Sequence, residues 1–372
     1  MPVSIEEAVA LTCLGAEPGS RNARELKALR EAVSEVTEDG PAVLLALAER
    51  LGIPPWERAG RVEAAQIRAR QQLDAGARRG LRTLAWFEPG YSGLLRQIVD
   101  PPIVLWMRGD WQFLLHPAVA IVGSRAGTPT GLKIAGEIAD ALARAGVTVV
   151  SGLARGIDAA GHESALAAGG ATVAVMGCGA DIVYPPEHRD LVERVVGHGT
   201  LVSEFAPGTL PEPHHFPLRN RIISGLCRAV VVIEASDRSG SLITARLALE
   251  QGREVMAVPG NVLSGRSRGC HALIRDGARL VETAADVLEE LGWAPRTAKP
   301  ASDDSGGNST KTLSVNELAV LMALGEPYSL DQLETMTGRT ASDLLATLAD
   351  LELAGNVTRI PGGHFVRLDV RC

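Results

Sequence analysis

Apolar residues between Val119 and Ala278 fall into short runs, and segments of helix length separate these runs. The five runs are VAIVGSR (119–125), VTVVSGLARGID (147–158), ATVAVMGCGAD (171–181), VVVIEASDRSGS (230–241) and VMAVPGN (255–261). The segments between them include Thr130–Arg144 and Ser241–Gly252. This alternation predicts β-α-β units on a parallel sheet, and hence an α/β domain.

The runs end in glycine, serine and arginine. In a parallel sheet, ligands bind outside the carboxyl ends of the strands. Backbone N–H groups, hydroxyls and guanidinium groups at such ends are suited to phosphate, although the same residues can form plain capped turns. We expect an anion-binding groove here, and its predicted residues are Gly123, Ser124, Arg125, Lys133, Ser151, Gly152, Arg155, Gly156, Ser239, Gly240 and Ser241.

The tract HFPLRNRIISGL (215–226) adds an aromatic side chain to this groove. Aromatic residues make up only 3% of the chain, so a phenylalanine three residues before an Arg-Asn-Arg sequence stands out. Because three prolines lie within or just before the tract, we expect a loop. A ring beside arginines predicts a base-stacking platform next to bound phosphates, and the alternative is a core phenylalanine with arginines in salt bridges. The predicted site residues are Phe216, Arg219, Asn220 and Arg221.

Two pairs of side chains raise other kinds of chemistry. Asp158 and His162 lie four residues apart and share a helix face, which suits an acid–base couple or a hydrogen-bonding pair that fixes the loop. We favour the second interpretation. His214 and His215 are adjacent, but we identify no carboxylate or cysteine at ligand spacing and expect no metal site.

The glycine spacings do not match nucleotide-cofactor sites. Gly123 and Gly127 do not form GxGxxG, and Gly177-Cys178-Gly179 lacks the third glycine before a helix. The segment Gly127–Lys133 has no GK[ST] ending. We therefore expect neither NAD nor ATP, and no cofactor.

The composition predicts a cytoplasmic protein. The five cysteines form no CxxC pair, which is typical of a reducing compartment. No run approaches the length of a membrane span, and the first residues do not resemble a secretory signal. The net charge of −7 argues against a protein that coats DNA nonspecifically, but a local basic groove remains compatible with it.

The flanking regions predict further domains. Residues 1–80 predict a helical N-terminal module, with helices over Ala23–Val36, Ala42–Leu51 and Arg58–Arg79. Residues 81–292 combine a bridging segment with the sheet domain, and residues 293–311 are a polar, flexible linker.

Residues 312–372 predict a helix, a helix-turn-helix and a hairpin, which is the order of a winged helix. The third helix, Thr340–Gly355, holds Asp343, Asp350 and Glu352 and no Lys or Arg. Since a helix that reads duplex DNA carries basic donors, we expect this domain to contact protein or to tune access to the groove.

The strings GSR, SGLARGID, HFPLRNRIISGL, SGSLITA (239–245), VPGN and LIRDGA (273–278) together resemble the DNA-processing protein A family, also called DprA or Smf. The resemblance implies an extended Rossmann-like domain that binds single-stranded DNA without sequence preference. It also implies a homodimer that protects incoming strands in natural transformation and helps to load RecA recombinase, with no catalysis.

One departure bears on the rival interpretation, a nucleotide N-glycosidase of the related Rossmann-like group. Those enzymes carry a PGGxGTxxE loop whose Glu acts in glycosidic cleavage, whereas this chain has SGSLITA with Thr244 near that position. An enzyme would need another carboxylate over the pocket, and Glu234 and Asp237 are the nearest candidates. His271 departs from the family pattern as well. A third interpretation is a regulator that senses a small nucleotide.

Overall fold

The computed structural model describes residues 4–14 and 40–293 and, nearer the C-terminus, residue 320 and residues 328–337, 339–353, 357–360 and 364–367. The chain divides into two compact units, Met1–Lys299 and Pro300–Cys372, and each is described by itself. The four-part division expected from the sequence stays a prediction.

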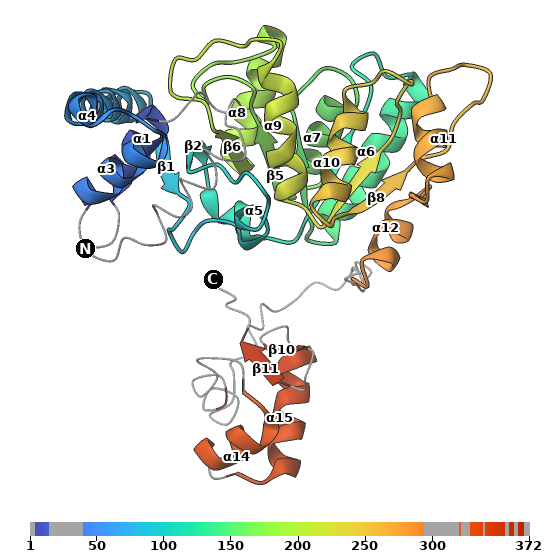
Figure 1. Cartoon of the computed structure of the whole chain (residues 1–372). Coiled ribbons are helices and arrows are strands. Elements are labelled where there is room, and N and C mark those ends of the chain that lie inside the picture. The colour runs from blue at the N-terminus through green and yellow to red at the C-terminus, as the bar shows by residue number, and fades with distance from the viewer. Residues whose placement is uncertain are drawn as a thin grey trace. The chain divides into compact units, whose positions relative to one another are not determined.

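A nine-stranded sheet forms the centre of the first unit (Figure 1). Its order is β1-β2-β6-β5-β4-β3-β7-β8-β9, in which β2 runs antiparallel to both neighbours and the pairs from β6 to β9 are parallel. The strands are β1 (Arg82–Ala85), β2 (Val104–Gly109), β3 (Ala118–Val122), β4 (Thr148–Ser151), β5 (Thr172–Val175), β6 (Gly199–Ser203), β7 (Ala229–Val232), β8 (Glu254–Ala257) and β9 (Arg279–Leu280). Each of the five apolar runs overlaps one parallel strand, so the prediction of a parallel α/β sheet is confirmed.

β6, which pairs with β5 and β2, is not among the strands expected from the sequence. This strand starts at Gly199 directly after the helix α8 (Arg189–His198). Gly197 and Gly199 mark this boundary in the sequence, but no loop separates helix from strand, and a strand of five residues gives too short a pattern to identify.

Helices cover both faces of the sheet. Alternate residues of β3 point to opposite sides: Val122 belongs to the core under one layer of helices and Ile121 to the core under the other. The first layer holds α5 (Gly93–Arg96), α9 (His215–Gly225), α10 (Ser241–Glu250) and α11 (Arg268–Arg275). The second holds α6 (Pro129–Arg144), α7 (Ile157–Ala167), α8 and α12 (Ala284–Glu290).

The expected loop at Phe216 is wrong, because the tract forms the helix α9. Pro217 is the third residue of this helix. The first N–H groups of a helix have no partner inside it, so a proline there removes no hydrogen bond. Pro217 is therefore compatible with the start of a helix and does not indicate a loop.

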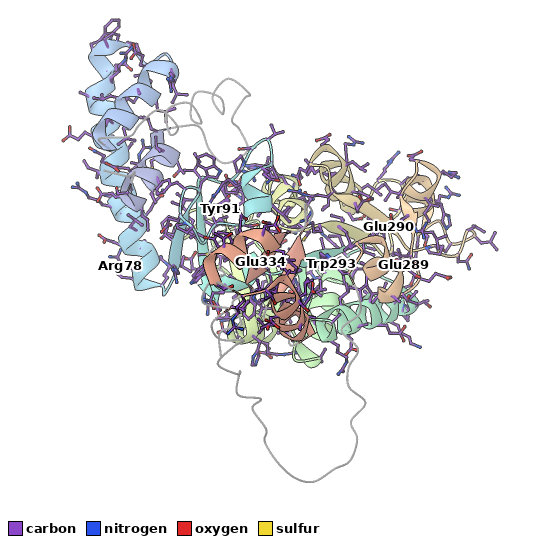
Figure 2. The ribbon with its side chains drawn as sticks, turned by 90° about the horizontal axis from the view of Figure 1, so that it is seen from below. Arg78, Tyr91, Glu289, Glu290, Trp293 and Glu334 are labelled. Atoms are coloured by element: carbon purple, nitrogen blue, oxygen red, sulfur yellow. The ribbon has the colours of Figure 1, made fainter. Side chains whose placement is uncertain are left out.

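Three N-terminal helices pack on the β1 and β2 end of the sheet and belong to the same compact unit. They are α1 (Ile5–Leu14), α3 (Gly40–Arg50) and α4 (Pro55–Arg78). The expected helix Ala23–Val36 lies outside the described residues. Figure 2 shows Arg78, at the end of α4, and Glu289 and Glu290, at the end of α12, toward opposite ends of this unit. Within the described part of the chain, no helix combines the length and the apolar character that a membrane crossing requires.

The second unit contains α14 (Leu330–Thr337), α15 (Ala341–Leu353) and an antiparallel hairpin of β10 (Val357–Ile360) and β11 (His364–Arg367). Leu333, Leu348 and Phe365 belong to its buried core. The first helix expected in this unit lies outside the described residues apart from Val320. The described elements follow the order expected for a winged helix.

Candidate nucleic-acid interface

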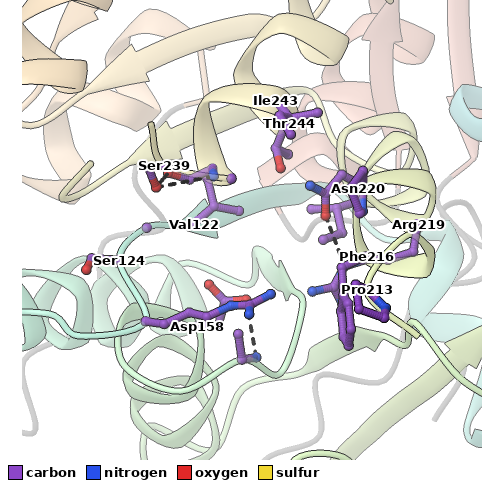
Figure 3. Close-up of a pocket in the computed structure, with 17 residues that line it drawn as sticks. Val122, Ser124, Asp158, Pro213, Phe216, Arg219, Asn220, Ser239, Ile243 and Thr244 are labelled. Carbon is purple, nitrogen blue, oxygen red and sulfur yellow. Dashed lines mark hydrogen bonds between the residues drawn. The ribbon is translucent and has the colours of Figure 1, made fainter. Parts of the chain in front are cut away.

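A cavity of about 430 Å³ lies at the carboxyl ends of the parallel strands (Figure 3). The chain passes from β3 through β4 and β5 to β6 on one side, and then returns to β7 on the other side of β3. Such a reversal leaves a crevice between the two strand ends, and open α/β sheets bind ligands there. Ser124 and Ser239 lie on one side of the cavity in Figure 3, and Phe216 and Arg219 lie across it.

Most of the predicted site residues meet at this crevice. Those that line the cavity are Gly123, Ser124, Arg125, Phe216, Arg219, Asn220, Ser239, Gly240 and Ser241. Gly152 and Arg155 line a smaller adjoining cavity of about 30 Å³, which shares Arg125, Phe216 and Arg219 with the first. The residues belong to four segments that are far apart in the sequence, as the strand-end argument requires.

Lys133 and Arg221 do not join them. Lys133 points into solvent from α6, with 75% of its side chain exposed and Glu137 3.6 Å away. Arg221 is buried on α9 and pairs with Glu204 at 2.7 Å and Asp100 at 3.2 Å. The expectation that five basic residues line one groove is therefore wrong for these two.

Ser151 and Gly156 line neither cavity, but they hold the neighbouring strand and loop in position. The Ser151 hydroxyl donates to the carbonyl of Ile121 at 2.6 Å, which ties β4 to β3. Gly156 has a φ of 76°, and a Cβ there would collide with the backbone of Ser124 and Arg125. Glycine is thus required where the loop after β4 passes the loop after β3.

The loop after β3 carries Ser124 and Arg125, and α6 begins at Pro129, close to the start of the expected segment Thr130–Arg144. Thr128 caps this helix by accepting the Gly131 N–H at 3.0 Å. The Thr128 hydroxyl in turn donates to Glu234 at 2.6 Å. These groups already satisfy the start of α6, so Ser124 and Arg125 face the cavity from a loop rather than from a helix terminus.

Glu234 and Asp237, the carboxylates considered for an enzyme, do not line the cavity. Glu234 is buried behind the loop, where it accepts from the Thr128 N–H and hydroxyl. Asp237 lies at the surface, 4.0 Å from Arg268. Among the described residues that line the cavity, Asp158 is the one carboxylate.

Asp158 holds the loop after β4. It is buried, and its Oδ2 accepts N–H groups from Gly152 at 3.1 Å and Ala154 at 3.3 Å. Burial raises the pKa of Asp158, and the field of Arg219 and the two N–H groups oppose that rise. His162 bonds instead to Thr172, at 2.6 Å. These contacts agree with the interpretation of Asp158 as a loop-fixing residue, but His162 is not its partner.

Arg219 reaches the cavity from α9, and two of its nitrogens donate hydrogen bonds within the protein. Its Nη1 donates to the carbonyl of Gly152 at 2.7 Å and to that of Val175, and its Nε donates to the Asn220 side chain at 3.0 Å. A Cβ on Gly152 would collide with this guanidinium. Burial lowers the pKa of Arg219 to about 10, so the side chain stays cationic at neutral pH.

Arg125 supplies the accessible positive charge. It is exposed, and no carboxylate of the described residues pairs with it. Its guanidinium carbon lies 5.3 Å from the centroid of the Phe216 ring, and that of Arg219 lies 5.8 Å from the same centroid. Phe216 is half-buried and also contacts Tyr184. The ring therefore lies among cations at the cavity wall rather than in the core.

The start of α10 closes the opposite wall. The hydroxyls of Ser239 and Ser241 are 2.7 Å apart. Ile243 and Thr244 extend this wall, and the sequence analysis did not include them among the site residues. Their positions in the first turn of a helix that starts at the predicted anion site were the signal that could have found them.

The reason for dismissing a metal at His214 and His215 is also wrong. Glu212 lies at ligand spacing, with its Oε2 3.4 Å from the Nδ1 of His214.

The fold and the pocket together define an extended Rossmann-like protein whose crevice presents arginine, hydroxyl and backbone N–H groups to an anionic ligand. Residues 82–292 match the family described as DNA recombination-mediator protein A, and residues 307–363 match the DprA winged helix domain. The chain belongs to the DNA recombination-mediator protein A family, and its second unit carries the winged-helix domain of that family.

Relatives support this membership. A putative DNA processing protein DprA of Mycobacterium tuberculosis is 38% identical over 87% of this chain and 90% of its own length. DNA processing protein DprA of Streptococcus pneumoniae is 47% identical over 54% of this chain and 71% of its own length. The X-ray structure of the S. pneumoniae protein matches with a TM-score of 0.68 and 35% identity, over 78% of this chain and 99% of that one.

A structure of DNA processing protein A from Helicobacter pylori matches with a TM-score of 0.52 and 29% identity, over 57% of this chain and 95% of that one. It was described for the single-stranded DNA binding mode of that protein.

Proposed function

We propose that this chain binds single-stranded DNA, without sequence preference, in the crevice between β3 and β7. The observation that carries the proposal is the pairing of exposed Arg125 with the half-buried ring of Phe216 at one cavity wall. A cation beside an accessible ring suits a phosphate next to a stacked base. The single-strand binding of the H. pylori relative supports the same assignment.

The groups in the crevice favour a single strand over a duplex. Stacking on Phe216 requires an unpaired base, because the faces of paired bases are covered by their neighbours. Hydroxyl groups at Ser124, Ser239 and Ser241 suit phosphate oxygens, which carry no sequence information. Binding is therefore expected to tolerate any base sequence.

On the family resemblance, we further propose that the chain protects incoming single strands in natural transformation and helps to load RecA recombinase onto them. It would do so in the cytoplasm, as a homodimer in which one strand crosses two pockets. Membership of the family supports this role.

We infer that the chain acts by binding rather than by catalysis. Glycosidic cleavage needs a carboxylate free to act on the ligand. Asp158 is committed to two backbone N–H groups, and Glu234 is committed to Thr128. Release of free base from nucleoside monophosphates, measured by chromatography and abolished in Glu234→Gln or Asp158→Asn, would favour the N-glycosidase instead.

Fluorescence anisotropy tests the binding proposal. Labelled oligothymidine should bind the full chain, while the equivalent duplex and unlabelled nucleoside monophosphates should compete weakly. A mixed-sequence oligonucleotide of the same length should compete as well as oligothymidine does. If the duplex competes equally, or if a monophosphate alone displaces the strand at similar concentration, the proposal fails.

A further inference from the structure

Three potential metal ligands lie at the rim of the crevice, at the start of α9. The ligand atoms of Glu212, His214 and His215 all lie within 4.8 Å of one another. The Glu212 carbonyl accepts the His215 N–H at 3.0 Å, so the backbone turns here and brings the side chains together. Pro213 and Phe216, their neighbours in the sequence, line the crevice.

The hydrogen bond of His215 prepares its ring for a metal. Its Nδ1 lies 3.2 Å from the carbonyl oxygen of Gly177. Since a carbonyl oxygen only accepts, Nδ1 carries the proton and the Nε2 of the neutral ring keeps its lone pair. Metal-binding histidines commonly hold their second nitrogen in this way. The Phe205 ring, with its centroid 4.1 Å away, packs against the imidazole and restricts its rotation.

The spacing of Glu212 and His214 fits a tetrahedral site. Bonds of about 2.05 Å from Zn²⁺ to nitrogen and oxygen place two ligand atoms about 3.3 Å apart. The Oε2 of Glu212 and the Nδ1 of His214 are 3.4 Å apart. Both side chains are more than half exposed, so rotations of their side-chain bonds can bring them to the buried His215.

A carboxylate is also needed here on electrostatic grounds. The first turn of α9 carries the partial positive charge of a helix N-terminus, which opposes a bound cation. Glu212 supplies a negative charge at that position, and imidazole ligands suit Zn²⁺ and its neighbours among the divalent transition metals. Three protein ligands leave one tetrahedral position for water or for another oxygen ligand.

We propose that Glu212, His214 and His215 bind one divalent transition-metal ion, of the Zn²⁺ class, at the rim of the crevice. The fourth position takes a phosphate oxygen of the bound strand, a step that rests on the proposed single-strand binding. The metal then adds a positive charge at the rim of the crevice that Arg125 and Phe216 line.

The metal site is tested first without DNA. The full chain, without a histidine tag and stripped with chelator, is titrated with Co²⁺, whose visible absorption reports coordination number. One Co²⁺ per chain should bind with a tetrahedral spectrum, and Zn²⁺ should displace it. His214→Ala and Glu212→Gln should each lower Co²⁺ affinity about tenfold or more. His198→Ala, which removes an exposed histidine at the end of α8, serves as the control and should bind as the parent does. Absence of saturable binding, or equal affinity in all variants, overturns the site.

The second measurement asks whether the metal contacts the strand. Zn²⁺ should tighten oligothymidine binding by the parent chain several-fold and should leave His214→Ala unchanged. If Co²⁺ and Zn²⁺ bind but strand affinity does not respond, the phosphate contact is wrong while the metal site stands. If no form of the chain binds oligothymidine, the proposed function fails independently of the metal.

Discussion

The guanidinium of Arg221 lies 2.7 Å from the Oε2 of Glu204 and is buried with it beneath α9. Asp100, from the segment before β2, pairs with the same arginine at 3.2 Å. One cation thus joins three parts of the chain: the bridging segment, the loop after β6 and α9. From the sequence alone, Arg221 is predicted to lie in the groove, next to the bound phosphates.

Replacing Arg221 is expected to cost stability. Arg221→Met leaves the buried Glu204 and the partly buried Asp100 without their cation, and breaking a buried ion pair from one side costs about 3–5 kcal/mol. The free energy of unfolding, from urea titration, should fall by this order. Adding Asp100→Asn and Glu204→Gln should recover part of the loss. Stability equal to that of the parent would show that the pair is not a structural element.

Arg125→Ala is expected to weaken single-strand binding without unfolding the chain, because this side chain is exposed. The loss of one phosphate contact should reduce the slope of log K against log salt by about 0.7. Lys133→Ala removes another exposed cation, away from the crevice, and should change both quantities little. Anisotropy across a salt series measures this, and similar losses in the two variants would contradict the placement of the site.

Phe216→Ala is expected to cost about 1–3 kcal/mol of single-strand affinity, which is typical for one stacked base. Its thermal midpoint should stay near that of the parent, since the ring is half-buried at the cavity wall. Phe205→Ala is the matched control: Phe205 is buried, so its loss should destabilise the fold by about 3–5 kcal/mol. If Phe216→Ala unfolds as readily as Phe205→Ala, the stacking role is wrong.

His162 is expected to make the fold sensitive to acid. Burial, together with the charges of Arg219 and His188, lowers its pKa from 6.5 to about 3. Between these two values the unfolded chain binds a proton that the folded chain does not. Stability should therefore fall as the pH drops below 6.5, by up to about 1.4 kcal/mol per pH unit from this group.

Urea titrations between pH 7 and pH 4 measure this slope. Carboxylates add their own dependence, so the comparison is with His162→Gln, in which the slope should be smaller. An unchanged slope in that variant would show that His162 does not contribute.

Removing residues 312–372 is expected to leave most of the single-strand affinity intact. The exposed residues of α15 are Ser342, Asp343, Leu345, Ala346, Ala349 and Glu352, where the side chains are described. This surface offers acids and small apolar groups rather than donors for phosphate. Anisotropy with oligothymidine on the truncated chain tests the point, and a truncated chain that no longer binds the single strand would contradict it. Micromolar duplex binding by the full chain that the truncation abolishes would show instead that the second unit binds duplex DNA.

The sequence by itself determined the parallel sheet and most of the crevice. Buried strands need continuous apolar runs, and these runs are visible without coordinates. Since Gly123–Arg125 and Ser239–Ser241 form the ends of two of the runs, the topology of a parallel sheet brings them together. The motifs that resemble the family then implied that the anion bound at this site is single-stranded DNA.

Only the tertiary structure decided which way α9 turns its arginines. Arg219 and Arg221 are two residues apart, which on a helix separates them by about 200°, so one faces the crevice while the other faces away from it. In the loop predicted from the prolines, both could have faced the ligand. The partners of Arg221 in its ion pairs, Asp100 and Glu204, lie 121 and 17 residues away in the chain. No local pattern records such distant contacts, because they exist only once the bridging segment and β6 have packed against the helix.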